Sequence, residues 1–184
     1  MPVKTPICDF KQTAKSFELK STNNEMVTLN NIKGESGTLI MFICNHCPYV
    51  KAVINDIVED CINLRNLGIK TVAICSNDAI NYPDDSFDNM ISFSKNHNFT
   101  FPYLIDETQK VAKNYNAVCT PDFFGYNKNL ELQYRGRIRE LKNLKPVRNG
   151  ESDLFKAMKK IAKTDKGPEE QIPSLGCSIK WLDN

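Results

Sequence analysis

The sequence has no long hydrophobic run and almost no net charge. Its 184 residues include 24 Lys and Arg against 22 Asp and Glu, a formal net charge of only +2. No stretch approaches the roughly 18–20 consecutive apolar residues of a membrane-spanning helix, and the first residues lack the apolar core of a secretion signal. The near-neutral balance gives no electrostatic attraction to nucleic acid. We therefore expect a single domain over residues 1–184 with neither a membrane nor a nucleic-acid partner.

A regular cysteine framework is also missing. The cysteines are odd in number and unevenly spaced, a poor pattern for structural disulfides, and a chain of this size needs none to stabilise its core. A reducing cytoplasm fits best, and there a close cysteine pair is more often catalytic or metal-binding than structural. The seven cysteines are Cys8, Cys44, Cys47, Cys61, Cys75, Cys119 and Cys177.

The most informative stretch is an apolar run that ends in a Cys-x-x-Cys motif. Thr38 to Cys44 is rich in branched and aromatic side chains, which is typical of a strand buried on both faces of a parallel sheet. A helical pattern follows directly, so the sulfur of Cys44 should lie among the free N–H groups of a helix N-terminus, which favour the thiolate. Two intervening residues allow a disulfide with Cys47. We interpret the pair as a redox dithiol; a structural disulfide or half of a zinc site are the alternatives, although zinc normally needs four ligands.

The remaining periodicity predicts alternating strands and helices. Residues 17–20 and 26–29 indicate a hairpin, and Asp106 with Gln109 resembles a capping box that opens a helix. Residues 1–15 are predicted to form an irregular lead-in, and residues 167–184, which show no clear period, a C-terminal tail. The order predicts an α/β, thioredoxin-like fold: a mixed central sheet with helices on both faces plus an N-terminal hairpin. Further strands are predicted at 70–75, 101–105, 122–126 and 130–134, and further helices over 50–64, 86–97 and 151–163.

Four segments make a resemblance to a known family specific. The chain resembles the thioredoxin-like, peroxiredoxin-related family of alkyl-hydroperoxide-reductase, thiol-specific-antioxidant and redoxin-type proteins over roughly residues 10 to 182. The segments are Cys44–Val50, Phe101–Gln109, Cys119–Phe124 and the tail segment Pro173–Trp181.

Chemistry and resemblance together suggest roles at the dithiol. We expect Cys44, predicted to be the more exposed sulfur, to attack as the thiolate, and Cys47 to resolve the mixed disulfide. His46 lies between them, as in related disulfide-forming oxidoreductases, and is expected to favour the Cys44 thiolate; the alternative is a solvated surface histidine. No metal and no cofactor are expected.

The resemblance also implies roles outside the motif. Thr120–Pro121 follows the third predicted helix, where thioredoxin-like folds place a cis-proline facing the dithiol, and would form a docking ledge for an incoming polypeptide. Cys119 and Cys177 are candidate additional redox thiols, with packed structural thiols as the alternative.

Two departures from related families bear on the activity. Peroxiredoxins carry Pro and Thr seven and three residues before their reactive cysteine, and aligned on Cys47 these positions hold Ile40 and Cys44. Thr38 to Ile43 also lacks the acidic residue that thioredoxins usually bury there. We therefore predict a thiol–disulfide oxidoreductase that cycles Cys44 and Cys47 with a protein or low-molecular-weight disulfide or thiol partner. The alternatives are a thiol peroxidase acting on hydroperoxides and a non-enzymatic redox sensor or binding module.

Overall fold

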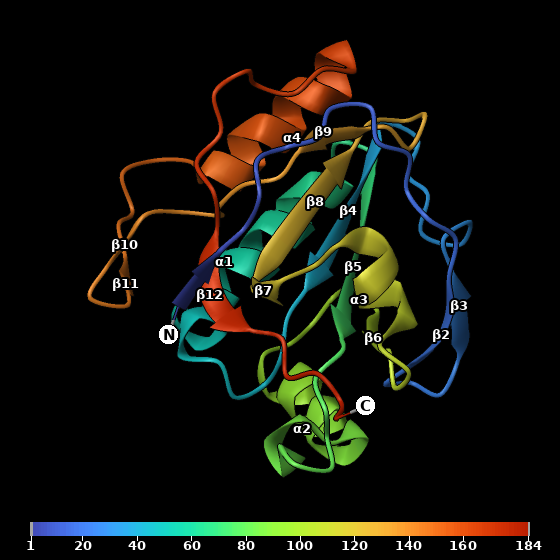
Figure 1. Ribbon diagram of the computed structural model, residues 1–184. Helices are drawn as coiled ribbons and strands as arrows, with labels where there is room; N and C mark the ends of the chain where they lie inside the picture. Colours follow the sequence, from blue (N-terminus) through green and yellow to red (C-terminus); the bar gives the residue numbers. More distant parts are fainter. Residues whose placement is uncertain (1, 184) are drawn as a thin grey trace.

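A seven-stranded mixed sheet forms the centre of the protein in the computed structural model, which describes residues 2–183 (Figure 1). The central strand β4 pairs in parallel with β5 and antiparallel with β8, and β5 pairs in parallel with β6. In spatial order the strands are β3 (Met26–Thr28), β2 (Glu18–Ser21), β6 (Tyr103–Ile105), β5 (Ile69–Cys75), β4 (Gly37–Phe42), β8 (Asp122–Tyr126) and β9 (Leu132–Tyr134).

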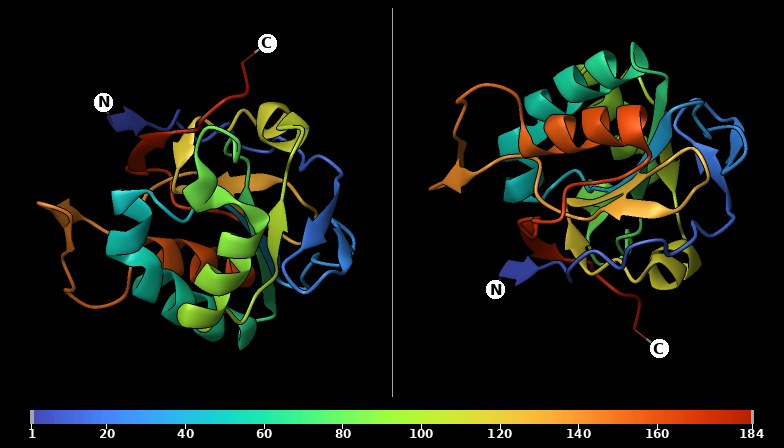
Figure 2. Two further views of the ribbon diagram at one scale, coloured as in Figure 1. Left: turned by 90° about the horizontal axis from the view of Figure 1, so that it is seen from below. Right: turned by 90° about the horizontal axis from the view of Figure 1, so that it is seen from above.

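Helices cover both faces of this sheet. α1 (Pro48–Arg65) and α4 (Asp153–Thr164) lie side by side on one face, and α3 (Lys110–Tyr115) lies on the other (Figure 2). α2 (Phe87–Asn96) lies beyond one end of the sheet, after a 3-10 turn at Pro83–Asp85 (Figure 1). The predicted mixed sheet, helices on both faces and hairpin of β2 and β3 are therefore confirmed.

The two faces explain why the sequence of β4 is almost continuously apolar. Leu39 and Met41 pack into the core beneath α1 and α4, whereas Ile40 and Phe42 pack into the core on the side of α3. Because successive side chains of a strand point to opposite faces, a strand covered on both sides needs apolar residues at every position. Every residue of β4 is buried accordingly. The same strand ends just before the Cys-x-x-Cys motif and so fixes its place.

The predicted capping box at α3 was wrong in one half. The carboxylate of Asp106 does cap the helix, since it accepts the backbone N–H groups of Val111 and Ala112 at 3.3 and 2.9 Å. Gln109 does not return the bond; its side-chain amide donates to the carbonyl of Lys180 in the C-terminal segment at 2.8 Å. Gln109 therefore holds the C-terminal segment instead of completing the predicted capping box.

Both chain ends contain strands that the sequence did not predict. β12 (Leu175–Ser178) pairs antiparallel with β1 (Pro2–Lys4) on one edge and with β7 (Cys119–Thr120) on the other. The prediction of an irregular lead-in was wrong at β1, and the C-terminal tail, in which no clear period was found, contains β12. Strands of two to four residues are too short to show a period, and their partners lie at opposite ends of the sequence.

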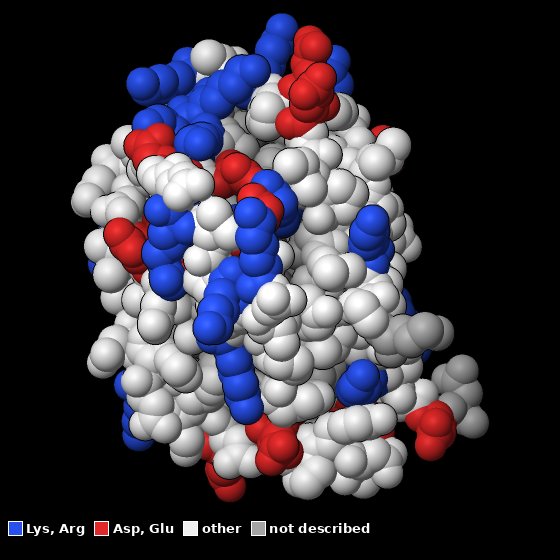
Figure 3. Space-filling view, turned by 90° about the vertical axis from the view of Figure 1, so that its left-hand side faces the viewer, with Lys and Arg blue, Asp and Glu red and all other residues white. Residues whose placement is uncertain are grey.

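A hairpin that the sequence did not predict, β10 (Leu141–Lys142) with β11 (Lys145–Pro146), projects from the face that Figure 3 shows. Lys and Arg side chains gather towards the top of this face and continue down its middle, with Asp and Glu among them. Arg139 and Arg148 both pair with Asp56 of α1, each at 3.0 Å. Part of the positive charge around this hairpin is thus compensated within the chain. Between residues 2 and 183, no helix is both long and apolar enough to cross a membrane.

Candidate functional site

The Cys-x-x-Cys motif forms the loop between β4 and α1. Pro48 is the first residue of α1, a position that suits proline because its missing N–H would have no helical partner there. Cys47 is consequently the N-cap residue of the helix. Both Cys44 and Cys47 are 0% exposed, so the predicted redox pair lies beneath the surface.

The sulfur of Cys47 stands among several hydrogen-bonding groups. It lies 2.9 Å from the sulfur of Cys177 and 3.2 Å from the carbonyl oxygen of Thr120. The carbonyl oxygen favours the protonated thiol. The opposite effect is larger: hydrogen bonds from the Cys44 thiol, the Cys177 thiol and the Val50 N–H lower the pKa of Cys47 to about 5, against the effect of burial.

Cys44 shows the opposite behaviour. Its interaction with Cys47 and its burial raise its pKa above the usual value, while the Thr120 hydroxyl, 3.3 Å away, acts weakly the other way. Cys44 and Cys47 are both 0% exposed, so the prediction that Cys44 is the more exposed sulfur was wrong. The two pKa directions favour the thiolate at Cys47 over the thiolate expected at Cys44. Because α1 begins at Pro48, its free N–H groups surround the second cysteine rather than the first.

His46 is oriented by a carboxylate that sequence reasoning missed. Its Nδ1 lies 2.5 Å from Oδ2 of Asp85, a fully buried side chain from the loop after β5. The same carboxylate accepts the backbone N–H of Asn45 at 2.7 Å and the side-chain amide of Asn77 at 2.8 Å. Asp85 thus fixes the motif loop from beneath. The sequence gives one signal for such a role of Asp85: the residue lies in a polar loop at the carboxyl end of a predicted parallel strand.

Cys44, His46 and Asp85 also bring three potential metal ligands together. Their ligand atoms lie within 4.8 Å of one another, and thiolate, imidazole and carboxylate are all groups that zinc binds. The Asp85 oxygens, however, already have donors in Asn45, His46 and Asn77. The group is complete as a hydrogen-bonded network, which favours an anchor for the loop over a metal site.

The predicted proline and the two additional cysteines also lie at this site. The Thr120–Pro121 bond is cis, as predicted, and both Thr120 side-chain and backbone oxygens contact the motif sulfurs. The backbone of Thr120, expected to form a docking ledge, is paired with β12, in which Cys177 lies opposite Thr120. Cys119 is fully buried and burial raises its pKa, whereas Cys177 is partly exposed.

Comparisons with known proteins agree with this architecture. A model of the AhpC/TSA family matches residues 10–141. An uncharacterized conserved protein from Geobacillus kaustophilus is similar over 100% of this chain and 98% of its own, with 38% identity and a TM-score of 0.92. A hypothetical protein from Sinorhizobium meliloti is 32% identical over 98% of both chains, with a TM-score of 0.89. Among curated proteins, no significant match was found.

A more distant solved structure supports the fold alone. The peroxidoxin BcpB of Mycobacterium tuberculosis superimposes with a TM-score of 0.57 at 13% identity, over 69% of this chain and 83% of its own. The fold is thioredoxin-like, as the sequence predicted.

Proposed function

Since the chain belongs to the AhpC/TSA family, we propose that it is a thiol–disulfide oxidoreductase whose nucleophile is Cys47. The observation that carries the proposal is the position of Cys47 at the N-terminus of α1, where N–H and thiol donors favour its thiolate. A thiol with a pKa near 5 is almost wholly ionised at neutral pH, whereas an ordinary thiol of pKa about 8.5 is only a few per cent ionised.

The reaction consists of two exchanges. The Cys47 thiolate attacks one sulfur of a disulfide R–S–S–R, forms the mixed disulfide Cys47–S–S–R and expels R–S⁻. A second cysteine of the chain then attacks the Cys47 sulfur, gives up its proton and expels the other R–S⁻. In sum, two cysteine thiols become one disulfide, and the substrate becomes two thiols. The sequence predicted that both thiols of this reaction belong to the Cys-x-x-Cys motif, as Cys44 and Cys47.

Burial favours a small disulfide over a polypeptide as the substrate. Cys44 and Cys47 are both 0% exposed. The backbone edge of β7, which could bind an extended polypeptide, is paired with β12. A low-molecular-weight disulfide therefore has easier access to Cys47 than a disulfide of a folded partner protein.

Parallel oxidation of the reduced protein tests the proposal. One half is mixed with 2-hydroxyethyl disulfide and the other with an equal concentration of hydrogen peroxide, and remaining thiols are counted over time after acid quenching. We expect thiols to be lost faster with the disulfide. Failure of the disulfide to react at Cys47 would overturn the proposal.

One observation favours a thiol peroxidase as the second candidate. The fully buried Cys47 thiolate, directly before Pro48, can react with a small hydroperoxide to give sulfenic acid and the corresponding alcohol or water. A second thiol would then form a disulfide and release water. Faster oxidation by hydrogen peroxide than by the disulfide, with sulfenic acid trapped at Cys47, would favour this activity.

A further inference from the structure

The C-terminal strand lies where a substrate strand would be expected. β12 runs antiparallel to β7 with Cys177 directly opposite Thr120. Gly176 makes this close approach possible, because a Cβ at that position would lie only 2.1 Å from the Thr120 carbonyl oxygen. The strand thereby brings the sulfur of Cys177 to 2.9 Å from that of Cys47.

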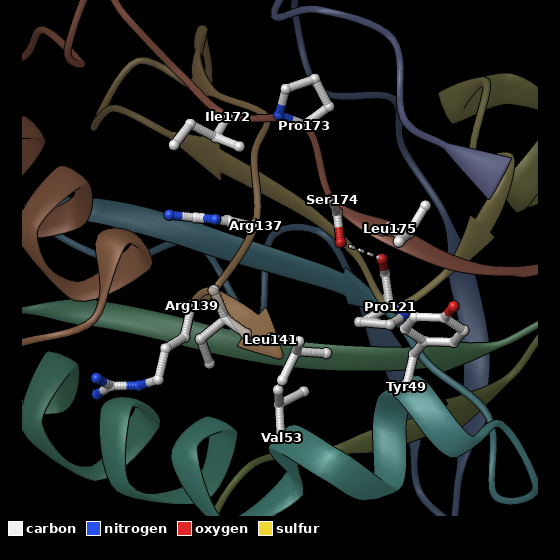
Figure 4. A pocket seen from close by; sticks show the side chains of 11 residues that line it. Tyr49, Val53, Pro121, Arg137, Arg139, Leu141, Ile172, Pro173, Ser174 and Leu175 are labelled. Carbon is white, nitrogen blue, oxygen red and sulfur yellow. Dashed lines mark hydrogen bonds between the residues drawn. The ribbon is translucent and has the colours of Figure 1, made fainter. Parts of the chain in front are cut away.

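Contacts on both sides of Cys177 hold this strand in place. Before it, the hydroxyl of Ser174 donates to the Pro121 carbonyl at 2.8 Å, and Figure 4 shows Ser174 and Leu175 lying beside that proline. After it, the backbone N–H of Lys180 donates to the side chain of Asn77 at 2.9 Å. The pairing of β1 covers the strand's outer edge. Cys177 is therefore a fixed part of the site rather than a residue of a loose tail.

Cys177 is well placed to bond with Cys47. A disulfide has its sulfurs about 2.05 Å apart, so the observed 2.9 Å needs to shorten by less than about 1 Å. Cys177 is partly exposed, so its proton and the expelled thiolate can reach solvent. Cys44, by contrast, is 0% exposed, and its sulfur lies 3.3 Å from the hydroxyl of Thr120.

We propose that Cys177 is the resolving cysteine, because its sulfur lies 2.9 Å from that of Cys47. This inference rests on the proposed function. In the second exchange, the Cys177 sulfur attacks the Cys47 sulfur of the mixed disulfide, a Cys47–Cys177 bond forms, and R–S⁻ leaves with the Cys177 proton. Cys44 remains a thiol throughout.

The same arrangement determines where the disulfide is reduced. An external thiol attacks Cys177, because this sulfur is the more exposed one and because the Cys47 thiolate, with a pKa of about 5, is the better leaving group. A second external thiol then attacks the mixed disulfide on Cys177 and restores its thiol. The external pair becomes a disulfide, so the electrons balance.

Oxidation by 2-hydroxyethyl disulfide tests the assignment. The reduced full chain is treated with this probe, free thiols are blocked with N-ethylmaleimide, and unreduced peptides are analysed by mass spectrometry. We expect a Cys47–Cys177 peptide and alkylated Cys44. In Cys177→Ser, whose hydroxyl keeps a hydrogen-bond donor beside Cys47, the first 2-mercaptoethanol should still be released, and the second about 10²-fold more slowly than in the wild type. The mixed disulfide on Cys47 should accumulate, an adduct that a purely structural role of Cys177 would not produce.

Two further variants serve as controls. Cys44→Ser should still form the Cys47–Cys177 peptide, and Cys8→Ser, which removes another partly buried thiol, should match the wild type. A Cys44–Cys47 peptide in the wild type, with unchanged release in Cys177→Ser, would overturn the inference and leave the proposed function intact. No release of 2-mercaptoethanol by the wild type would overturn both. Circular dichroism confirms that each variant is folded.

Discussion

Two cysteines on the same helix, Cys47 and Cys61, have similar burial and opposite chemistry. Cys47 is 0% exposed at the N-terminus of α1, and Cys61 is 2% exposed in the body of that helix. Hydrogen-bond donors lower the pKa of Cys47 to about 5, whereas burial raises the pKa of Cys61 to about 12. Cys75 at the end of β5 behaves like Cys61, since burial raises its pKa to about 12. Burial alone therefore does not decide whether a cysteine of this protein is reactive.

The difference lies in the groups that face each sulfur. A helix has free N–H groups only in its first turn, so Cys47 receives the Val50 N–H together with two thiols. Around Cys61 the backbone N–H groups are already bonded within the helix, and its main favourable contact is the side chain of Thr71. Donors aimed at a desolvated sulfur stabilise its charge, and their absence leaves only the cost of desolvation.

The largest expected contrast is between the exchange rates of two variants, one without the Cys47 thiol and one without the Cys61 thiol. Cys47→Ser should lower the rate of exchange with 2-hydroxyethyl disulfide by at least about 10²-fold, because the only strongly ionised thiol is lost. Cys61→Ser should leave the rate within about twofold. The rate is measured from the release of 2-mercaptoethanol. Equal loss in both variants would indicate that folding, rather than the thiolate, determines the rate.

A pH titration of the thiolate tests the difference between Cys47 and Cys61 without any oxidant. The far-ultraviolet thiolate absorbance of the wild type should rise as the pH increases through about 5 and then stay level through neutral pH. The sign follows from the lowered pKa: below it Cys47 is protonated and inactive, and above it the thiolate persists. Cys47→Ser should lack this step, while Cys61→Ala should keep it. A wild-type step near the pH of an ordinary thiol would contradict the assignment.

Substitution of Cys44 tests how much its thiol alone lowers the pKa of Cys47. A hydrogen bond to a charged group is worth about 1.5–3 kcal/mol, or roughly one to two pKa units. We expect Cys44→Ala to raise the Cys47 pKa by about that amount and Cys44→Ser, which keeps an O–H donor, to raise it less. The measurement is the same titration. An unchanged midpoint in Cys44→Ala would show that the N–H groups and Cys177 suffice.

The sequence predicted the central part of this site better than its surroundings. The buried strand, the helix after Cys47 and the cis peptide at Pro121 follow from apolar runs, helical spacing and a resemblance in short motifs, all of which are local signals. The apolar spacing predicted a helix over 50–64, within two residues of the observed start at Pro48, but it did not indicate which of the two cysteines faces the free N–H groups. Helix boundaries are in general less well determined by pattern than the helices themselves.

The parts of the site that the sequence did not predict depend on contacts between residues far apart in the chain. Asp85 lies 39 residues from His46, and Cys177 lies 130 residues from Cys47. Both belong to short segments without periodicity. Asp85 lies in the 3-10 turn after β5, and the position of Cys177 depends on the pairing of β12 with β7. The resemblance of the tail indicated that Cys177 was a candidate redox thiol, but the pairing of β12 with β7 is visible only in the structure.

The smallest expected effect tests whether Cys61 has any role beyond packing. Cys61→Ala removes one buried sulfur from the core beneath α1, so it should lower the free energy of unfolding by about 1 kcal/mol through the cavity that remains. The titration step of Cys47 and the exchange rate should not change, because Cys61 donates nothing to that site. Chemical denaturation followed by circular dichroism measures the stability loss. If Cys61→Ala instead shifted the Cys47 midpoint, the two ends of α1 would be coupled, and position at the helix N-terminus alone would not explain the reactive thiolate.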